Sequence, residues 1–176
     1  MASTCISAST QEKLLRARAA AARLALLSSA EKNGILQASA DAIEAHEQSI
    51  LEANHKDIEN SGLEGAMRER LLLTPSRIRD MAQGVREVAA LPDPIGETIA
   101  EWTKSNGLHI RKVRVPLGVI GIIYESRPNV TVDTSVLSLK TGNAIVLRGG
   151  KEAARSNQVL VDVLTAVSGV PLGAIE

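Results

Sequence analysis

RVPLGVIGIIYESRPN (residues 114–129) and TGNAIVLRGGKE (residues 141–152) are the two segments that decide the fold. Each is an apolar run followed by a loop. The first loop is rich in hydrogen-bonding side chains, and the second is cationic and holds two adjacent glycines. The stretch from Asn129 to Thr141 between them is typical of a helix, with Gly142 placed to cap it. Strand, helix and strand in this order predict a βαβ unit whose loops can hold an anionic ligand.

The apolar runs predict a parallel sheet. Gly118 to Tyr124 is nearly continuous in apolar residues, which predicts a strand buried on both faces, and Ala144 to Leu147 is the second strand. A helix is expected from near Ser156, and Leu172 to Glu176 is typical of the approach to a third strand. So small a sheet would leave a long apolar edge unpaired. We therefore expect an α/β fold in which residues 114–176 form an incomplete parallel βαβ unit.

The first half of the chain is predicted to be helical over residues 10–97, after a disordered leader at residues 1–9. Four helices have recognisable composition, start or stop signals. They are Thr10–Leu27, a helix opened by the capping box of Ser28 and Glu31, Glu47–Ile58, and a helix opened by Thr74-Pro75.

Residues 98–113 are predicted to form a β-hairpin arm. Two partly alternating segments flank Asn106-Gly107, a pair that favours a two-residue type I′ turn with positive φ at both positions. A two-stranded hairpin alone is marginal in water. The arm is therefore expected to pack on something outside itself, and a partner subunit is one candidate.

Composition excludes several classes of function. The chain has 20 basic and 20 acidic residues, so no global field favours nucleic acid or an anionic membrane. No apolar run approaches the length of a membrane span. Cys5 is the only cysteine and the three histidines lack ligand spacing, so neither a disulfide nor a metal site is expected. An organelle transit peptide at Lys13 to Leu27 is an alternative to a folded helix, but a cytoplasmic protein is the expectation.

The loop after the first strand is the first candidate site. A hydroxyl, a guanidinium and an amide at Ser126, Arg127 and Asn129 could fix a carboxylate or phosphate, or donate to an oxyanion. Alternatively, Asn129 caps the helix and Arg127 forms a surface ion pair.

The loop Arg148-Gly149-Gly150-Lys151 is the second candidate site. Its glycines would let main-chain amides approach a ligand, and its cations suit a phosphate, in particular the 2′-phosphate of NADP(H). The alternative is a glycine turn with solvated cations. Neither the P-loop motif nor Gly-x-Gly-x-x-Gly occurs. Spacing alone therefore predicts an anion-binding α/β unit and no more.

The chain resembles the gamma-glutamyl phosphate reductases (glutamate-5-semialdehyde dehydrogenases) of the aldehyde dehydrogenase superfamily. The similarity lies in Val113–Asn129 and Ser138–Ala153, with support from Leu91–Gly96. It implies reduction of gamma-glutamyl phosphate (L-glutamate 5-phosphate) by NADPH to L-glutamate 5-semialdehyde and phosphate, the second step of proline synthesis from glutamate.

The resemblance also implies roles by position. Ser126 falls near an asparagine that holds the oxyanion in many aldehyde dehydrogenases. Arg148 matches a lysine that holds the adenosine ribose, and Lys151 lies near a ribose-binding glutamate of NAD users, where a cation suits NADP. The 98–113 hairpin matches an oligomerisation arm, which implies a homo-oligomer.

The family nucleophile is a cysteine downstream in a separate catalytic domain, so no catalytic residue is expected within this chain. The isolated chain is not expected to turn over substrate. We expect it to bind NADPH weakly or not at all. Two alternatives remain open: a non-catalytic binding or oligomerisation fragment of such an enzyme, and a truncated reading frame without a stable fold.

Overall fold

The computed structural model describes residues 9–176. The predicted leader, apart from Ser9, lies outside the described residues, as does Cys5. Ser9 itself caps the first helix, since its hydroxyl and the Glu12 carboxylate exchange hydrogen bonds with each other's main-chain amides. The elements are α1 (Thr10–Leu24), α2 (Ser29–Ala45), α3 (Glu47–Ser61), α4 (Gly65–Leu71), α5 (Pro75–Ala90), β1 (Thr98–Thr103), β2 (His109–Val113), β3 (Val119–Ile123), α6 (Pro128–Lys140), β4 (Ala144–Arg148), a 3₁₀ turn (Lys151–Ala153) and α7 (Ala154–Thr165).

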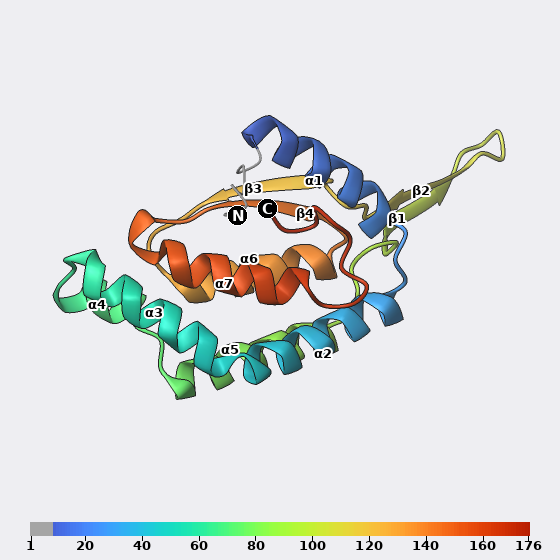
Figure 1. The fold of residues 1–176 in the computed structure, drawn as a ribbon. Helices are drawn as coiled ribbons and strands as arrows, with labels where there is room; N and C mark the ends of the chain where they lie inside the picture. Colours follow the sequence, from blue (N-terminus) through green and yellow to red (C-terminus); the bar gives the residue numbers. More distant parts are fainter. Residues whose placement is uncertain (1–8) are drawn as a thin grey trace.

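The elements form an α/β arrangement of layers around a small parallel sheet (Figure 1). α1 covers one face of β3 and β4, and α6 and α7 lie on the other. α2, α3 and α5 pack outside α6 and α7 as a further layer. Buried apolar residues from α1 through to Ile175 join in one core, so the helical half and the βαβ unit fold as one body.

The sheet has the predicted parallel order. β3 pairs with β4 in register from Val119 opposite Ala144 to Ile123 opposite Arg148. On the other side of β4, Ile145 forms a parallel bridge with Ile175, and its amide donates to the Ala174 carbonyl at 2.8 Å. The approach to a third strand is therefore present, and β4 is the central strand of the described residues.

The prediction that the first strand is buried on both faces is wrong. β3 alternates between exposed and partly covered positions, and Ile123 is 86% exposed. β3 lies at the edge of the described sheet and the helices α1 and α6 pack mainly against β4, so Val119, Gly121 and Ile123 share one open face. Its apolar composition leaves this side suited to contact with further protein.

Local signals located the helices well except near residue 65. Ser28 and Glu31 form the predicted capping box, and Thr74 caps α5 through the Arg77 amide. α1 ends three residues before the predicted Leu27. The short helix α4 was not predicted, because it has a glycine at its first position and no side-chain cap.

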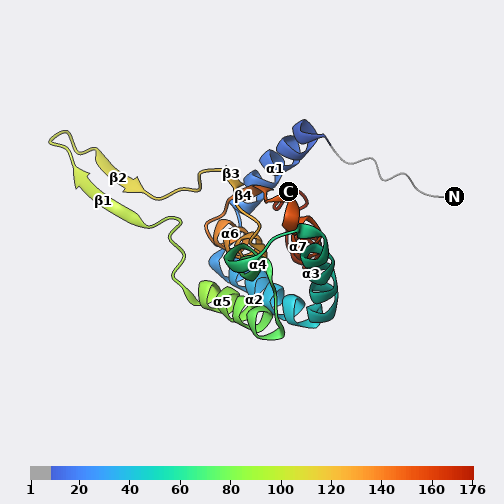
Figure 2. The ribbon, with the colours of Figure 1, turned by 90° about the vertical axis from the view of Figure 1, so that its left-hand side faces the viewer.

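β1 and β2 form an antiparallel hairpin that projects from the body (Figure 2). The predicted two-residue type I′ turn is wrong. Of Asn106 and Gly107, only Gly107 has positive φ. The Gly107 amide donates to the Lys104 carbonyl, and the Lys104 amide donates to the Leu108 carbonyl. This is a three-residue loop with glycine in the left-handed position. The Asn106 side chain instead accepts from the Leu108 amide at 3.2 Å.

A buried charge network joins α2, α6 and the segment after α5. The Lys32 ammonium lies 2.8 Å from the Asp93 carboxylate, which also accepts from Ser29 and the Ile95 amide. Burial alone would raise the pKa of Asp93, but these hydrogen bonds outweigh it and lower the pKa. The Lys140 ammonium donates to the Ala89 carbonyl at 2.8 Å. Polar contacts thus fix the end of α6 against the outer helices.

Candidate functional site

The loops that follow β3 and β4 meet at the carboxyl edge of the sheet. The Tyr124 amide donates to the Arg148 carbonyl at 3.1 Å, which continues the pairing beyond the strands. Ligands in open α/β sheets bind beyond this edge. The parallel register therefore brings the two predicted loops together.

Gly149 and Gly150 lie directly beneath the first loop. A Cβ atom on Gly150 would overlap the Ser126 hydroxyl, and one on Gly149 would overlap the Asn157 amide and touch the Tyr124 ring. Neither glycine has positive φ. Their small size therefore makes room for the chain's own loop, and this differs from the predicted close approach to a ligand.

Ser126 is held within this contact. Its hydroxyl donates to the Glu152 carboxylate at 2.6 Å, and this bond lowers the pKa of Glu152. A serine hydroxyl has one proton. While that proton is committed to Glu152, the Ser126 side chain cannot also donate to a substrate oxyanion.

The amino end of α7, behind the glycines, is capped by a carboxylate from another helix. Asp57 on α3 accepts from the Ser156 amide and the Ser156 hydroxyl, each at 2.7 Å, and also from the Arg155 amide. Helix amino ends often bind phosphate. Here the Arg155 and Ser156 amides of the first turn already have an acceptor within the chain.

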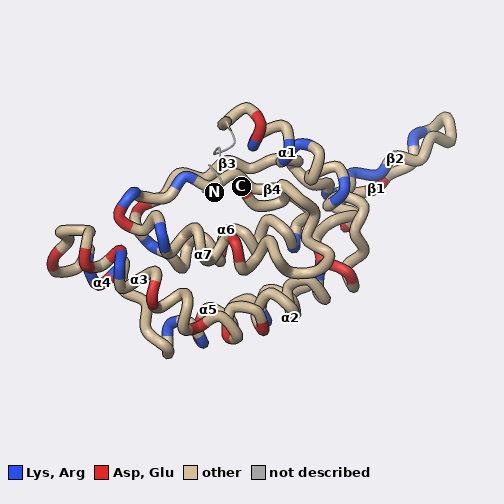
Figure 3. The backbone as a smooth tube through the Cα atoms, viewed as in Figure 1, with Lys and Arg blue, Asp and Glu red and all other residues tan. Residues whose placement is uncertain are grey.

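Arg148 and Lys151 line an open cavity of about 860 Å³ beside α1 and α7. Lys13 and Arg16 of α1 also line it, and Arg16 forms a bidentate pair with Glu176 at 2.6 and 2.9 Å. Basic residues from α1 and from the loop after β4 therefore line one cavity, and Figure 3 shows how Lys and Arg positions are distributed along the backbone. The cavity includes Gly149 and Gly150 but not Ser126.

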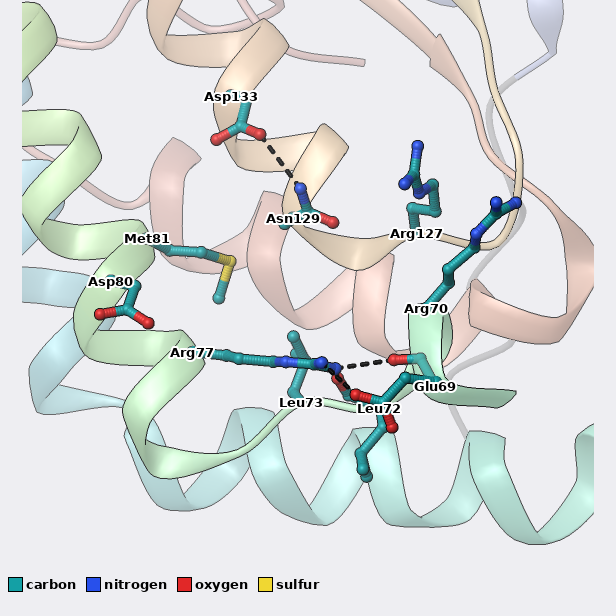
Figure 4. A pocket seen from close by; sticks show the side chains of 10 residues that line it. All are labelled: Glu69, Arg70, Leu72, Leu73, Arg77, Asp80, Met81, Arg127, Asn129 and Asp133. Carbon is teal, nitrogen blue, oxygen red and sulfur yellow. Dashed lines mark hydrogen bonds and ion pairs between the residues drawn. The ribbon is translucent and has the colours of Figure 1, made fainter. Parts of the chain in front are cut away.

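Arg127 and Asn129 line a second cavity of about 420 Å³, between α4, α5 and the start of α6 (Figure 4). The Asn129 amide donates to the Asp133 carboxylate at 3.2 Å. Partial burial raises the pKa of Asp133, opposed by this bond. The predicted residues thus divide: Ser126 touches Gly150, while Arg127 and Asn129 face a different cavity from Arg148 and Lys151.

Several site residues carried no sequence signal. Asp57 and Ser156 meet from positions 57 and 156, and Arg70 of α4 and Asp80 of α5 line the same cavity as Arg127. Asp133 was within reach of prediction, because it follows Asn129 by one helical turn.

Two kinds of feature are absent from residues 9–176. None of the helices there is both long and apolar enough to cross a membrane. No cluster of three or more His, Cys, Asp or Glu side chains in that range is arranged to hold a metal ion.

Comparisons with known proteins agree with this geometry. Residues 3–176 match the aldehyde dehydrogenase family model. The chain is 60% identical to the gamma-glutamyl phosphate reductase of Koribacter versatilis, over 95% of the chain and 41% of that protein. It is 54% identical to the protein of the same name from Moorella thermoacetica, over 97% of the chain and 42% of that protein.

Solved structures give the same result. The crystal structure of gamma-glutamyl phosphate reductase from Thermotoga maritima matches 94% of the chain and 42% of its own, with a TM-score of 0.89 and 40% identity. The structure from Saccharomyces cerevisiae matches 96% of the chain and 46% of its own, with a TM-score of 0.87 and 32% identity. The chain spans about two fifths of the length of the curated relatives it matches.

Proposed function

Because the chain belongs to the aldehyde dehydrogenase family, we propose that it serves the NADPH-dependent reduction of gamma-glutamyl phosphate. The products are L-glutamate 5-semialdehyde and phosphate, in the synthesis of proline from glutamate and in the cytoplasm. The single observation that carries the proposal is the high identity to reductases of this name along nearly the whole chain. Fold alone would not support it, because one fold serves many reactions.

The cofactor part of the proposal depends on the larger cavity. When bound, a nicotinamide cofactor supplies the hydride. Arg148 and Lys151 on its rim fit the ribose and a 2′-phosphate, which favours NADP(H). The capped end of α7 supports this assignment, since it leaves phosphate recognition to these cations. Gly149 and Gly150 belong to this site through their main chain.

The substrate part rests on the loop after β3. Arg127 and Asn129 are the proposed contacts to the anionic substrate, from a cavity large enough for a small metabolite. Ser126 remains a candidate for the oxyanion through its main-chain amide, or through its hydroxyl once released from Glu152.

The partner part rests on the hairpin. Ile99, Trp102 and Leu108 are each close to half exposed or more on an arm that extends from the body (Figure 2). Strands of this kind are stabilised by a second surface. The proposed surface is another subunit, so that the enzyme is a homo-oligomer. The same arm favours the second candidate function, that of a non-catalytic binding or oligomerisation fragment of such an enzyme.

A chimera tests the proposed function. Residues 3–176 replace the matching segment of the Koribacter versatilis enzyme, and the gene is placed in a bacterium that requires proline because it lacks its own reductase. Growth without proline is expected. A folded chimera that does not support growth, beside a Koribacter enzyme that does, would reject the proposal.

A further inference from the structure

The cavity that Arg127 lines also contains charged side chains that have no assigned role in the proposed reaction. It has a volume of about 420 Å³, within the range of small-molecule sites. Apolar side chains of Leu73 and Met81 form part of its wall. Leu72 also lines it. The other lining side chains are charged or polar: Glu69, Arg70, Arg77, Asp80, Arg127, Asn129 and Asp133.

The charges are separated across the cavity. In Figure 4, Asp80 and Asp133 lie on one side, and Arg70 and Arg127 lie on the other. Arg77 is already engaged below them, because it donates to the Leu72 carbonyl at 2.6 Å and pairs with Glu69. A ligand with a positive and a negative group at one end matches this arrangement.

The acidic side has no cation of its own among the described residues. Asp133 accepts only from the neutral Asn129 amide, and partial burial raises its pKa. A carboxylate in such surroundings is stabilised by an ammonium group that comes close to it.

The basic side favours a carboxylate. Arg127 is the N-cap of α6, so its main chain lies at the positive end of the helix dipole, which favours an anion there. Within the described residues Arg127 has no acidic partner. Arg70 reaches only Glu125, at 3.3 Å and with both side chains half exposed or more, a pair that contributes little.

Taking the proposed function as the premise, we propose that this cavity binds the α-amino acid end of the substrate. Arg127 pairs with the α-carboxylate and Asp133 with the α-ammonium, while the phosphorylated end extends toward the Ser126 loop. The two residues determine specificity for an amino acid over the same chain without its amino group. The wrong ligand would leave one of these two charges in the cavity without its partner, and this is the basis of the distinction.

Titration of the isotope-labelled 176-residue chain tests the proposal by NMR. L-Glutamate is the probe, glutarate lacks the ammonium, and 4-aminobutyrate lacks the α-carboxylate. L-Glutamate is expected to shift the amide signals of residues 127 and 129–133 with a dissociation constant on the order of 1 mM. Both analogues are expected to bind about ten-fold more weakly, equivalent to one lost charged contact.

Two variants and two controls complete the design. Asp133→Asn is expected to weaken the binding of L-glutamate about ten-fold and to leave the binding of glutarate unchanged. Arg127→Gln is expected to leave the binding of 4-aminobutyrate unchanged. Arg68→Gln and Glu87→Gln remove charges of the same kinds outside the cavity and are expected to change nothing. Two results would overturn the proposal. One is equal affinity for L-glutamate and glutarate, and the other is the absence of any shift in residues 127 and 129–133 at L-glutamate concentrations well above roughly 1 mM.

The result is separable from the proposed function. If the chimera supports growth without proline but the chain binds L-glutamate and glutarate equally, the proposed function holds and the assignment of this cavity is wrong. Binding of L-glutamate as expected beside an inactive, folded chimera would do the reverse.

Discussion

The Asp57 carboxylate on α3 accepts two hydrogen bonds of 2.7 Å from Ser156, one from its amide and one from its hydroxyl. The acceptor is 2% exposed and lies at the first turn of α7. An acidic group here stabilises the helix dipole as an N-cap would, although it comes from a distant helix. It also joins the outer helical layer to the candidate cofactor loop.

Replacing Asp57 is expected to destabilise the whole body. Asp57→Ala removes the cap and leaves the buried Ser156 amide and hydroxyl without their acceptor, at a cost of about 1–3 kcal/mol. Urea unfolding followed by circular dichroism measures it. Asp41→Asn, on an exposed carboxylate paired with Arg86, is the control and should change the midpoint little. Equal midpoints for Asp57→Ala and the unaltered chain would show that the cap contributes nothing.

Gly150→Ala is expected to lower stability, because its Cβ would overlap the Ser126 hydroxyl. Overpacking of this kind costs about 1–3 kcal/mol. Gly34→Ala in α2 is the matched control, since nothing lies within 4 Å of its added Cβ. The control should be neutral or stabilising by roughly 0.5–1 kcal/mol.

A second substitution identifies the cause of the Gly150→Ala effect. Ser126→Gly removes the overlapping hydroxyl, so the double variant should recover part of the lost stability, as judged by thermal melts. Additive losses from the two changes would argue against direct contact between the loops.

Stability should depend on acid through Asp93. Its folded pKa lies below the ordinary 3.8, so its contribution is present above about pH 4 and is lost as pH falls through the lowered pKa. Asp93→Asn is therefore expected to cost roughly 1–3 kcal/mol at pH 7, where Lys32 loses its charged partner. The difference in the free energy of unfolding between the variant and the unaltered chain should become smaller in stronger acid. A difference of constant size down to pH 2 would contradict the assigned role.

The hairpin should mediate self-association through its exposed apolar side chains. Trp102 is the only tryptophan in the chain, so its fluorescence reports burial of the arm. We expect a concentration-dependent blue shift, together with a larger species in sedimentation velocity. Trp102→Glu should abolish both, whereas Leu26→Glu, at an 86% exposed position outside the hairpin, should not. A larger species that survives Trp102→Glu would place the contact elsewhere.

Sequence patterns located what is encoded locally. The Ser28 and Glu31 capping box and the proline after Thr74 act over a few residues, and both lie where expected. The order of β3, α6 and β4 was equally legible, because parallel strands require a crossover between them.

Features that depend on contacts between distant residues could not be predicted in the same way. The open side of β3 depends on which neighbour covers it, and composition does not show this. The conformation at Asn106 depended on loop length, which the Asn-Gly pair alone does not specify. Asp57 meets Ser156, and Arg70 comes to line the same cavity as Arg127, only through tertiary packing.

The most direct test of the central claim is the phosphate dependence of the chimera in the oxidative direction. An enzyme that forms gamma-glutamyl phosphate from L-glutamate 5-semialdehyde must incorporate inorganic phosphate for each NADP⁺ it reduces. The expected result is NADPH formation that requires phosphate and falls to background without it. NADPH formation at the same rate in phosphate-free buffer, with glutamate as product, would contradict the proposed reaction.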